Sequence, residues 1–131
     1  MRGIYILILK LNKNIKLEVG RLGGINFTKG LYAYVGSAMN GIENRVKRHF
    51  SDNKKIYWHI DYLLKNKSIK IKAVLYKKAN KKEECKIAKK LNKAGVLIPN
   101  FGSSDCKCKS HLFKIKNLKI ISKLKFKEYK K

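Results

Sequence analysis

Acidic residues are scarce in this chain of 131 residues: Asp and Glu number 8, against 33 Lys and Arg, giving a formal net charge of +25. An excess of positive charge this large favours a polyanionic partner, which is DNA, RNA or an anionic membrane surface. A long basic amphipathic helix with a broad apolar face is also missing, which disfavours the membrane surface. We therefore expect nucleic acid as the partner, with no membrane contact.

A second explanation of the composition stays open. Sequences rich in Lys and Ile and without Gln, as this one is, are typical of hyperthermophile proteins. Lys enrichment of that kind normally comes with Glu enrichment, however, and Glu is scarce here. We therefore take a hyperthermophile composition as only a partial explanation of the positive charge.

Long apolar runs and paired cysteines are lacking too. The N-terminal run from Ile4 to Leu9 is too short for a membrane span, and no small-residue cleavage site follows it. Three cysteines, two of them in Cys106-x-Cys108, make a secreted disulfide framework improbable and fit a reducing cytoplasm. Apolar residues still make up 44% of the chain, which excludes a disordered polypeptide.

Hydrophobic periodicity predicts a mixed α+β chain that forms one domain over residues 1–131. Expected strands cover residues 3–11, 15–19 (as the hairpin partner of the first), 30–36, 69–76, 111–115 and 118–121. Expected helices cover residues 41–50, 56–64 and a segment that starts at an Asn80 cap, with Glu83 completing a capping box, and stops at Gly95. Residues 125–131 form a basic tail expected to fray.

The strand GLYAYVGSA (30–38) carries two tyrosines on one face, and it leads into a helix in which Arg45 and His49 are four residues apart. Tyr34, Arg45 and His49 can therefore line one surface, where an Arg suits a phosphate. Lys47 and Arg48 belong to the same helix, so spacing alone fits an ordinary solvated basic face equally well.

Gly3-Ile4-Tyr5 in the first strand and Tyr34-Val35-Gly36 in the later one resemble the paired motifs of the GIY-YIG nuclease superfamily. Arg45 and His49 in the following helix match that pattern, and Glu84 is the best match to the glutamate that the family carries on a later helix. The segments WHIDYLL (58–64), Glu84-Cys85 and FGSSDCKCKSHLF (101–113) resemble a largely archaeal branch of the superfamily. A departure from the usual pattern is an insertion over residues 6–33, expected to add a hairpin between the two tyrosine motifs.

The resemblance implies an α+β fold with a small antiparallel sheet and flanking helices. It also implies a metal-dependent endonuclease that hydrolyses phosphodiester bonds in DNA, favoured over RNA, in DNA repair or processing. Glu84 would hold one Mg²⁺ or Mn²⁺, and Arg45 would stabilise charge on the phosphate. Tyr5 would act as general base or orient the attacking water, Tyr34 would bind the water or phosphate, and His49 would assist proton transfer. No small-molecule cofactor is implied. Expected nucleic-acid contacts are Lys47, Arg48, Ser37, Ser103 and Ser104.

A zinc site is a minority hypothesis for Cys85, Cys106, Cys108 and His111. The spacing is not that of a standard zinc finger, so buried cysteines that pack as small hydrophobic residues are favoured. A different function also stays open: a nucleic-acid-binding module that keeps the fold without cutting. Its binding would be strongly salt-dependent.

Overall fold

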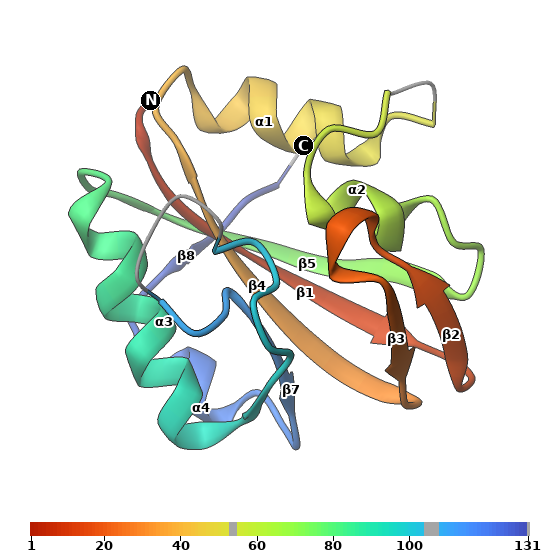
Figure 1. The fold of residues 1–131 in the computed structure, drawn as a ribbon. Coiled ribbons are helices and arrows are strands. Elements are labelled where there is room, and N and C mark those ends of the chain that lie inside the picture. Colours follow the sequence, from red (N-terminus) through yellow and green to blue (C-terminus); the bar gives the residue numbers. More distant parts are fainter. Residues whose placement is uncertain (53–54, 104–107, 131) are drawn as a thin grey trace.

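The computed structural model describes residues 1–52, 55–103 and 108–130. Its main feature is a six-stranded sheet in the order β6-β7-β4-β1-β5-β8, in which every neighbouring pair is antiparallel (Figure 1). The strands of this sheet are β1 (Gly3–Leu11), β4 (Gly30–Ala38), β5 (Ile69–Lys78), β6 (Val96–Leu97), β7 (Leu112–Ile115) and β8 (Lys127–Glu128). A separate two-stranded sheet pairs β2 (Ile15–Glu18) with β3 (Gly24–Phe27). The expected α+β fold is confirmed.

In the described part of the chain, four helices flank the sheet, with a short 3₁₀ turn at Gly20–Leu22. They are α1 (Ile42–Phe50), α2 (His59–Leu64), α3 (Lys82–Ala94) and α4 (Lys119–Ser122). Within the described residues, no helix is long and apolar enough to cross a membrane.

The central strand β1 is buried on both faces, so its alternating side chains build two cores. Tyr5, Leu7 and Leu9 pack into one core with α1, α2 and the β2–β3 hairpin. Ile4, Ile6 and Ile8 pack into the other core with α3 and α4. Figure 1 shows α1 and α2 at one end of the molecule and α3 and α4 at the other.

The expected pairing of residues 15–19 with the first strand is wrong. Both edges of β1 are occupied, by β4 and by β5, so β2 has no edge of β1 to join and pairs with β3 instead. The hairpin lies within the insertion, and its Ile15, Leu17 and Ile25 pack against the core beneath α2. The insertion thus adds a hairpin, as expected, and that hairpin completes one core.

Two further elements differ from expectation. Residues 56–58 precede α2, because the Asp61 carboxylate accepts the backbone N–H groups of Tyr57 and Trp58 and so caps the helix at Trp58. The expected strand at 118–121 is helix α4, which starts where Asn117 Oδ1 accepts the N–H of Lys119 at 2.9 Å.

The tail expected to fray is paired with the sheet over its middle. Residues 127–128 form β8 against β5, and the N–H of Tyr129 donates to the carbonyl of Val74 at 2.7 Å.

The α3 helix begins close to its expected position. Asn80 Oδ1 accepts the N–H of Lys82, the first residue of the helix, at 3.1 Å, but the N-cap position is occupied by Lys81 and not by Asn80.

Candidate functional site

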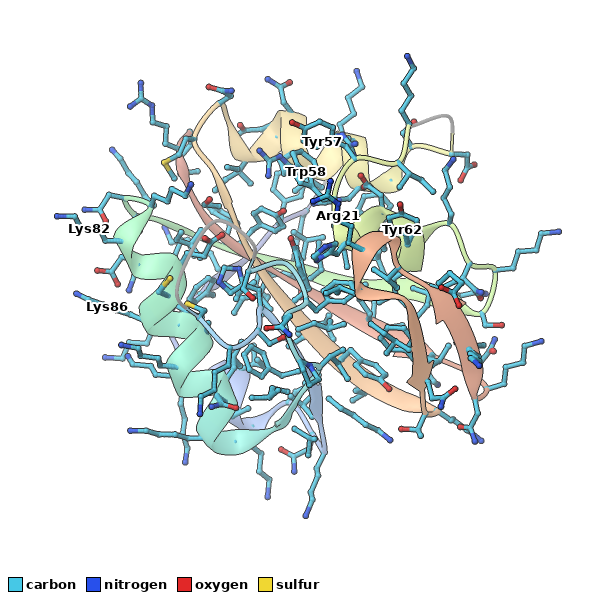
Figure 2. The ribbon with its side chains drawn as sticks, viewed as in Figure 1. Arg21, Tyr57, Trp58, Tyr62, Lys82 and Lys86 are labelled. Carbon is cyan, nitrogen blue, oxygen red and sulfur yellow. The ribbon has the colours of Figure 1, made fainter. Side chains whose placement is uncertain are left out.

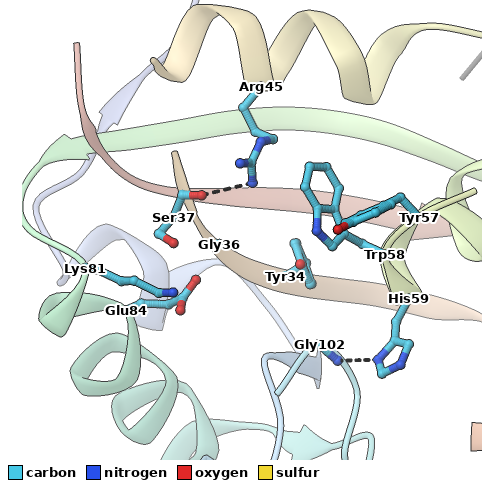
Figure 3. Close-up of a pocket in the computed structure, with 10 residues that line it drawn as sticks. All are labelled: Tyr34, Gly36, Ser37, Arg45, Tyr57, Trp58, His59, Lys81, Glu84 and Gly102. Atoms are coloured by element: carbon cyan, nitrogen blue, oxygen red, sulfur yellow. Dashed lines mark hydrogen bonds between the residues drawn. The ribbon is translucent and has the colours of Figure 1, made fainter. Parts of the chain in front are cut away.

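A polar pocket of about 550 Å³ opens where the end of β4 meets α1, α3 and the segment before α2 (Figure 3). Its lining residues are Tyr34, Gly36, Ser37, Arg45, Tyr57, Trp58, His59, Lys81, Glu84 and Gly102. Four of the predicted site residues, Tyr34, Ser37, Arg45 and Glu84, therefore line one space although they are up to 50 positions apart in the chain.

Tyr5 lies directly beneath this pocket rather than in its lining. It pairs with Gly36 across the β1–β4 ladder, and a Cβ built on Gly36 would meet the Tyr5 phenol at 2.5 Å. Only glycine at this position leaves room for the ring. The Tyr5 hydroxyl and His49 Nε2 are hydrogen-bonded at 2.8 Å, and both side chains are buried. Two of the predicted site residues, Tyr5 and His49, are thus in direct contact.

Burial decides the protonation of the phenols. It raises the pKa of Tyr5 to about 12, although the Arg45 guanidinium opposes the shift. Burial also raises the pKa of Tyr34 well above its ordinary value, with the nearby Tyr5 adding to the effect. Both hydroxyls are therefore protonated near neutral pH and act as hydrogen-bonding groups.

The two tyrosines of β4 have different surroundings. The ring of Tyr34 lies 6.4 Å from that of Tyr5 and packs edge-on against Phe101. The Tyr32 ring packs against Phe27, and its hydroxyl donates to the carbonyl of Thr28 at 2.7 Å. Tyr34 belongs to the pocket, and Tyr32 is a packing residue of the adjoining core.

Arg45 reaches from α1 across the pocket. Its Nη1 donates to the Ser37 carbonyl at 2.9 Å, and its guanidinium lies 4.3 Å from the centroid of the Trp58 ring (Figure 3). These two contacts fix the guanidinium at the pocket wall. Trp58, which also lines the pocket, thus packs against Arg45.

Arg48 is held by the protein itself. Its guanidinium donates to both carboxylate oxygens of Asp61, at 2.8 and 2.9 Å, and lies 4.3 Å from the Trp58 ring centroid. Burial opposes ionisation of Asp61, but hydrogen bonds from Arg48 and from the N–H groups of Trp58 and Tyr57 outweigh it and hold the pKa of this carboxyl below its ordinary value. This pair joins α1 to α2. Lys47, the other basic residue predicted on this helix, is exposed.

Glu84 supplies a carboxylate to the pocket from the first turn of α3, where its side chain is 7% exposed. Lys81 lies beside it in the lining (Figure 3). Glu83, its neighbour, forms an ion pair with Lys86 at 3.4 Å instead, and Lys86 points away from the molecule (Figure 2). The Asn80–Glu83 capping box is thus replaced by an ordinary pair along the helix.

A second group of side chains next to Glu84 has the composition of a metal site. One ligand atom each of Cys85, Cys108 and His111 lies within 4.8 Å of the other two. His111 Nδ1 is also 4.0 Å from Glu84 Oε2.

Two of the other predicted site residues, Cys106 and Ser104, lie outside the described residues. Ser103 is buried at 7% exposure.

Sequence reasoning missed several lining residues. His59 Nδ1 accepts the N–H of Gly102 at 2.8 Å, which fastens the loop that follows Phe101 to the start of α2. Gly102 has a φ of 71°, a conformation that favours glycine. Tyr57 is 79% exposed at the rim. The sequence could have indicated Tyr57 as a binding residue, because it is an aromatic residue next to a tryptophan. Nothing in the sequence distinguishes Lys81 from the many other lysines.

The fold and the pocket define a small α+β domain with a polar site that combines one carboxylate, one guanidinium and protonated phenols. A family model described as "Domain of unknown function DUF123" matches residues 4–130, so the chain belongs to this family. Neither the curated proteins nor the solved structures include a significant match to it.

Proposed function

We propose that the protein is a metal-dependent nuclease of the GIY-YIG type that hydrolyses phosphodiester bonds in DNA, in DNA repair or processing. The observation that carries the proposal is the convergence of Glu84, Arg45 and Tyr34 on one pocket of about 550 Å³ above Tyr5 and His49, large enough for a phosphate together with its neighbouring sugar or base. A carboxylate and a guanidinium facing one space suit a bound cation and a phosphate oxygen respectively.

Glu84 would hold one Mg²⁺ or Mn²⁺ in this pocket. The donor set fits a hard cation that keeps several waters, since Glu84 is the carboxylate that the described lining residues supply and substrate oxygens can complete the shell. When bound, the cation supplies Lewis-acid polarisation of the phosphate. A single carboxylate predicts weak cation affinity without nucleic acid.

The other side chains would bind and orient the substrate. Arg45, already fixed by Ser37 and Trp58, directs its remaining N–H groups at the phosphate. Tyr34 donates its hydroxyl to the phosphate or to the attacking water. With its pKa raised to about 12, Tyr5 acts through its hydrogen bond to His49, which orients this imidazole for proton transfer, and not as an ionised base.

Tyr57 extends the site from phosphate to base. It is largely exposed at the pocket rim, and its ring meets Trp58 edge-on with centroids 5.4 Å apart. Figure 2 shows Tyr57 and Trp58 together on the same side of the molecule. An exposed ring held in this way suits stacking on a nucleobase next to the bound phosphate.

The experiment is a cleavage assay over duplex, branched and single-stranded DNA and RNA, with Mg²⁺, with Mn²⁺ and with a chelator. We expect metal-dependent cleavage of DNA that is abolished in Glu84→Gln. The matched control is Glu83→Gln, on the same helical turn but paired with Lys86, which should cleave like the wild type. Equal cleavage by the wild type and Glu84→Gln would refute the proposal.

A second candidate is a nucleic-acid-binding module without catalysis. The raised pKa of both phenols favours it, because neither supplies a base near neutral pH. It predicts salt-sensitive binding with no cleavage under any of these metal conditions.

A further inference from the structure

Three potential ligands for a soft metal ion come from two distant parts of the chain. Cys85 lies on α3, and Cys108 and His111 lie just before β7. Both cysteines are thiols and partly buried, and His111 is 1% exposed. Packing alone would explain one buried cysteine, but it does not bring two thiols and an imidazole to the same point.

The spacing of these atoms suits tetrahedral Zn²⁺. Ligands held at about 2.0–2.3 Å from a tetrahedral ion are about 3.3–3.8 Å from one another. The three ligand atoms lie within 4.8 Å of each other. Side-chain shifts of about 1 Å would therefore complete the coordination. The described residues supply three ligands, which leaves a fourth coordination position open.

The surroundings of His111 match those of a metal-bound histidine. Such an imidazole usually directs its other ring nitrogen at a carboxylate, which fixes the ring orientation. Here Glu84 Oε2 lies 4.0 Å from His111 Nδ1, which is beyond hydrogen-bond distance, so a shift of about 1 Å would let the carboxylate support the ring while Nε2 binds zinc. Glu84 is also the neighbour of Cys85 in α3, so one turn of helix supplies both a ligand and the supporting carboxylate.

We propose that Cys85, Cys108 and His111 bind one Zn²⁺ that ties α3 to the segment before β7. Thiolate and imidazole ligands favour zinc over Mg²⁺ or Mn²⁺, so this site differs in chemistry from the pocket that holds Glu84 and Arg45. A hollow of about 190 Å³ lies between α3 and this segment and is lined in part by Cys108. The zinc holds His111 against Glu84 and thereby fixes the carboxylate of the neighbouring pocket.

The test is metal binding by the full chain, stripped of metal and kept reduced so that no disulfide competes. Co²⁺ serves as the probe, because thiolate ligands give it intense charge-transfer absorption and a tetrahedral site gives strong visible bands. We expect about one Co²⁺ per chain, displaced by Zn²⁺. Cys85→Ser and Cys108→Ser should each lose the charge-transfer absorption, and Glu83→Gln should keep it.

Thermal unfolding gives an independent reading. Added Zn²⁺ should raise the melting temperature of the wild type and of Glu83→Gln, because binding to the folded state adds to its stability. It should leave both cysteine variants unchanged. A reduced wild type that binds neither Co²⁺ nor Zn²⁺ would overturn the proposal, as would cysteine variants that bind both as the wild type does. Neither measurement uses nucleic acid, so its outcome is separate from that of the cleavage assay.

Discussion

At the residue scale, the contact between Tyr5 and His49 is the best-defined feature beneath the pocket. The phenol is 1% exposed and hydrogen-bonded to the imidazole at 2.8 Å, and burial raises its pKa to about 12. A group whose folded pKa exceeds its unfolded pKa stabilises the fold at low pH and loses that contribution as pH rises from the unfolded towards the folded value.

Tyr5 therefore predicts alkaline sensitivity. Between pH 10 and 12 the unfolded phenol ionises and the folded one does not, so stability falls by about 1.4 kcal/mol per pH unit from this group. Denaturant unfolding at pH 9 and pH 11 should show a smaller alkaline loss in Tyr5→Phe than in the wild type. Tyr57→Phe, which removes an exposed hydroxyl, should behave like the wild type. An identical loss in Tyr5→Phe and the wild type would contradict the burial argument.

The sequence predicted which residues share the site, but it did not predict their protonation states or their hydrogen-bond partners. Tyr34, Arg45 and Glu84 were placed by motif and spacing, and they share a pocket. The protonation of Tyr5 depends on how deeply the ring lies beneath Gly36, which no local pattern encodes. Arg48 shows the same limit: helix spacing identifies a basic residue, but only the tertiary fold brings Asp61 to it.

At the scale of elements, the Arg48–Asp61 pair connects α1 to α2. Asp61 is fully buried and binds both the guanidinium and two backbone N–H groups at the start of α2. If the Arg48 guanidinium is removed, the Asp61 carboxylate stays buried without a positive charge to offset its lost hydration. Removing one partner therefore lowers the stability of the fold by more than the ion pair itself contributes.

Arg48→Ala should lower the free energy of unfolding at pH 7 by about 3 kcal/mol. Because the folded pKa of Asp61 is depressed, the stability contributed by its ionised form is present above about pH 4 and is lost as pH falls below it. The gap between Arg48→Ala and the wild type should therefore narrow in acid. Urea unfolding at pH 7 and pH 3.5 measures both the destabilisation at neutral pH and its decrease in acid. The control is Lys47→Ala, an exposed position, which should stay within about 0.5 kcal/mol of the wild type.

Long, strongly periodic elements were predictable, and short or late ones were not. The strands at β1, β4 and β5 and the helices α1 and α3 follow from alternation and helical spacing. The partner of β2 depends on which edges of β1 other strands already occupy, and that is a property of the whole sheet. Helix α4 spans four residues, too few for its period to show.

At the scale of the whole molecule, the charge of +25 dominates. Lysine side chains project from all around the fold (Figure 2), so nonspecific attraction to a polyanion does not need the pocket. Binding should weaken steeply with salt, because each phosphate contact releases counterions.

Two substitutions should separate phosphate contacts from base contacts. Lys47→Ala, on the exposed side of α1, should reduce the slope of log affinity against log salt by about 1. Tyr57→Ala should weaken binding to single-stranded DNA by about 1–3 kcal/mol without changing that slope, since stacking carries no charge. Lys16→Ala, on β2 rather than on α1, is the control expected to change neither quantity. Fluorescence anisotropy at several salt concentrations checks all three, and a changed slope in Tyr57→Ala would contradict the stacking assignment.

The most direct test of the proposed nuclease site is the single-turnover cleavage rate with saturating protein and a range of Mn²⁺ concentrations, for the wild type, Glu84→Gln and Glu83→Gln. Saturation removes differences in DNA affinity, so the rate reports the chemical step. We predict that Glu84→Gln is slower by about 10² or more at every Mn²⁺ concentration, while it binds DNA as the wild type does. Glu83→Gln should match the wild type. Equal rates for all three proteins, or no Mn²⁺-dependent cleavage by the wild type, would contradict it.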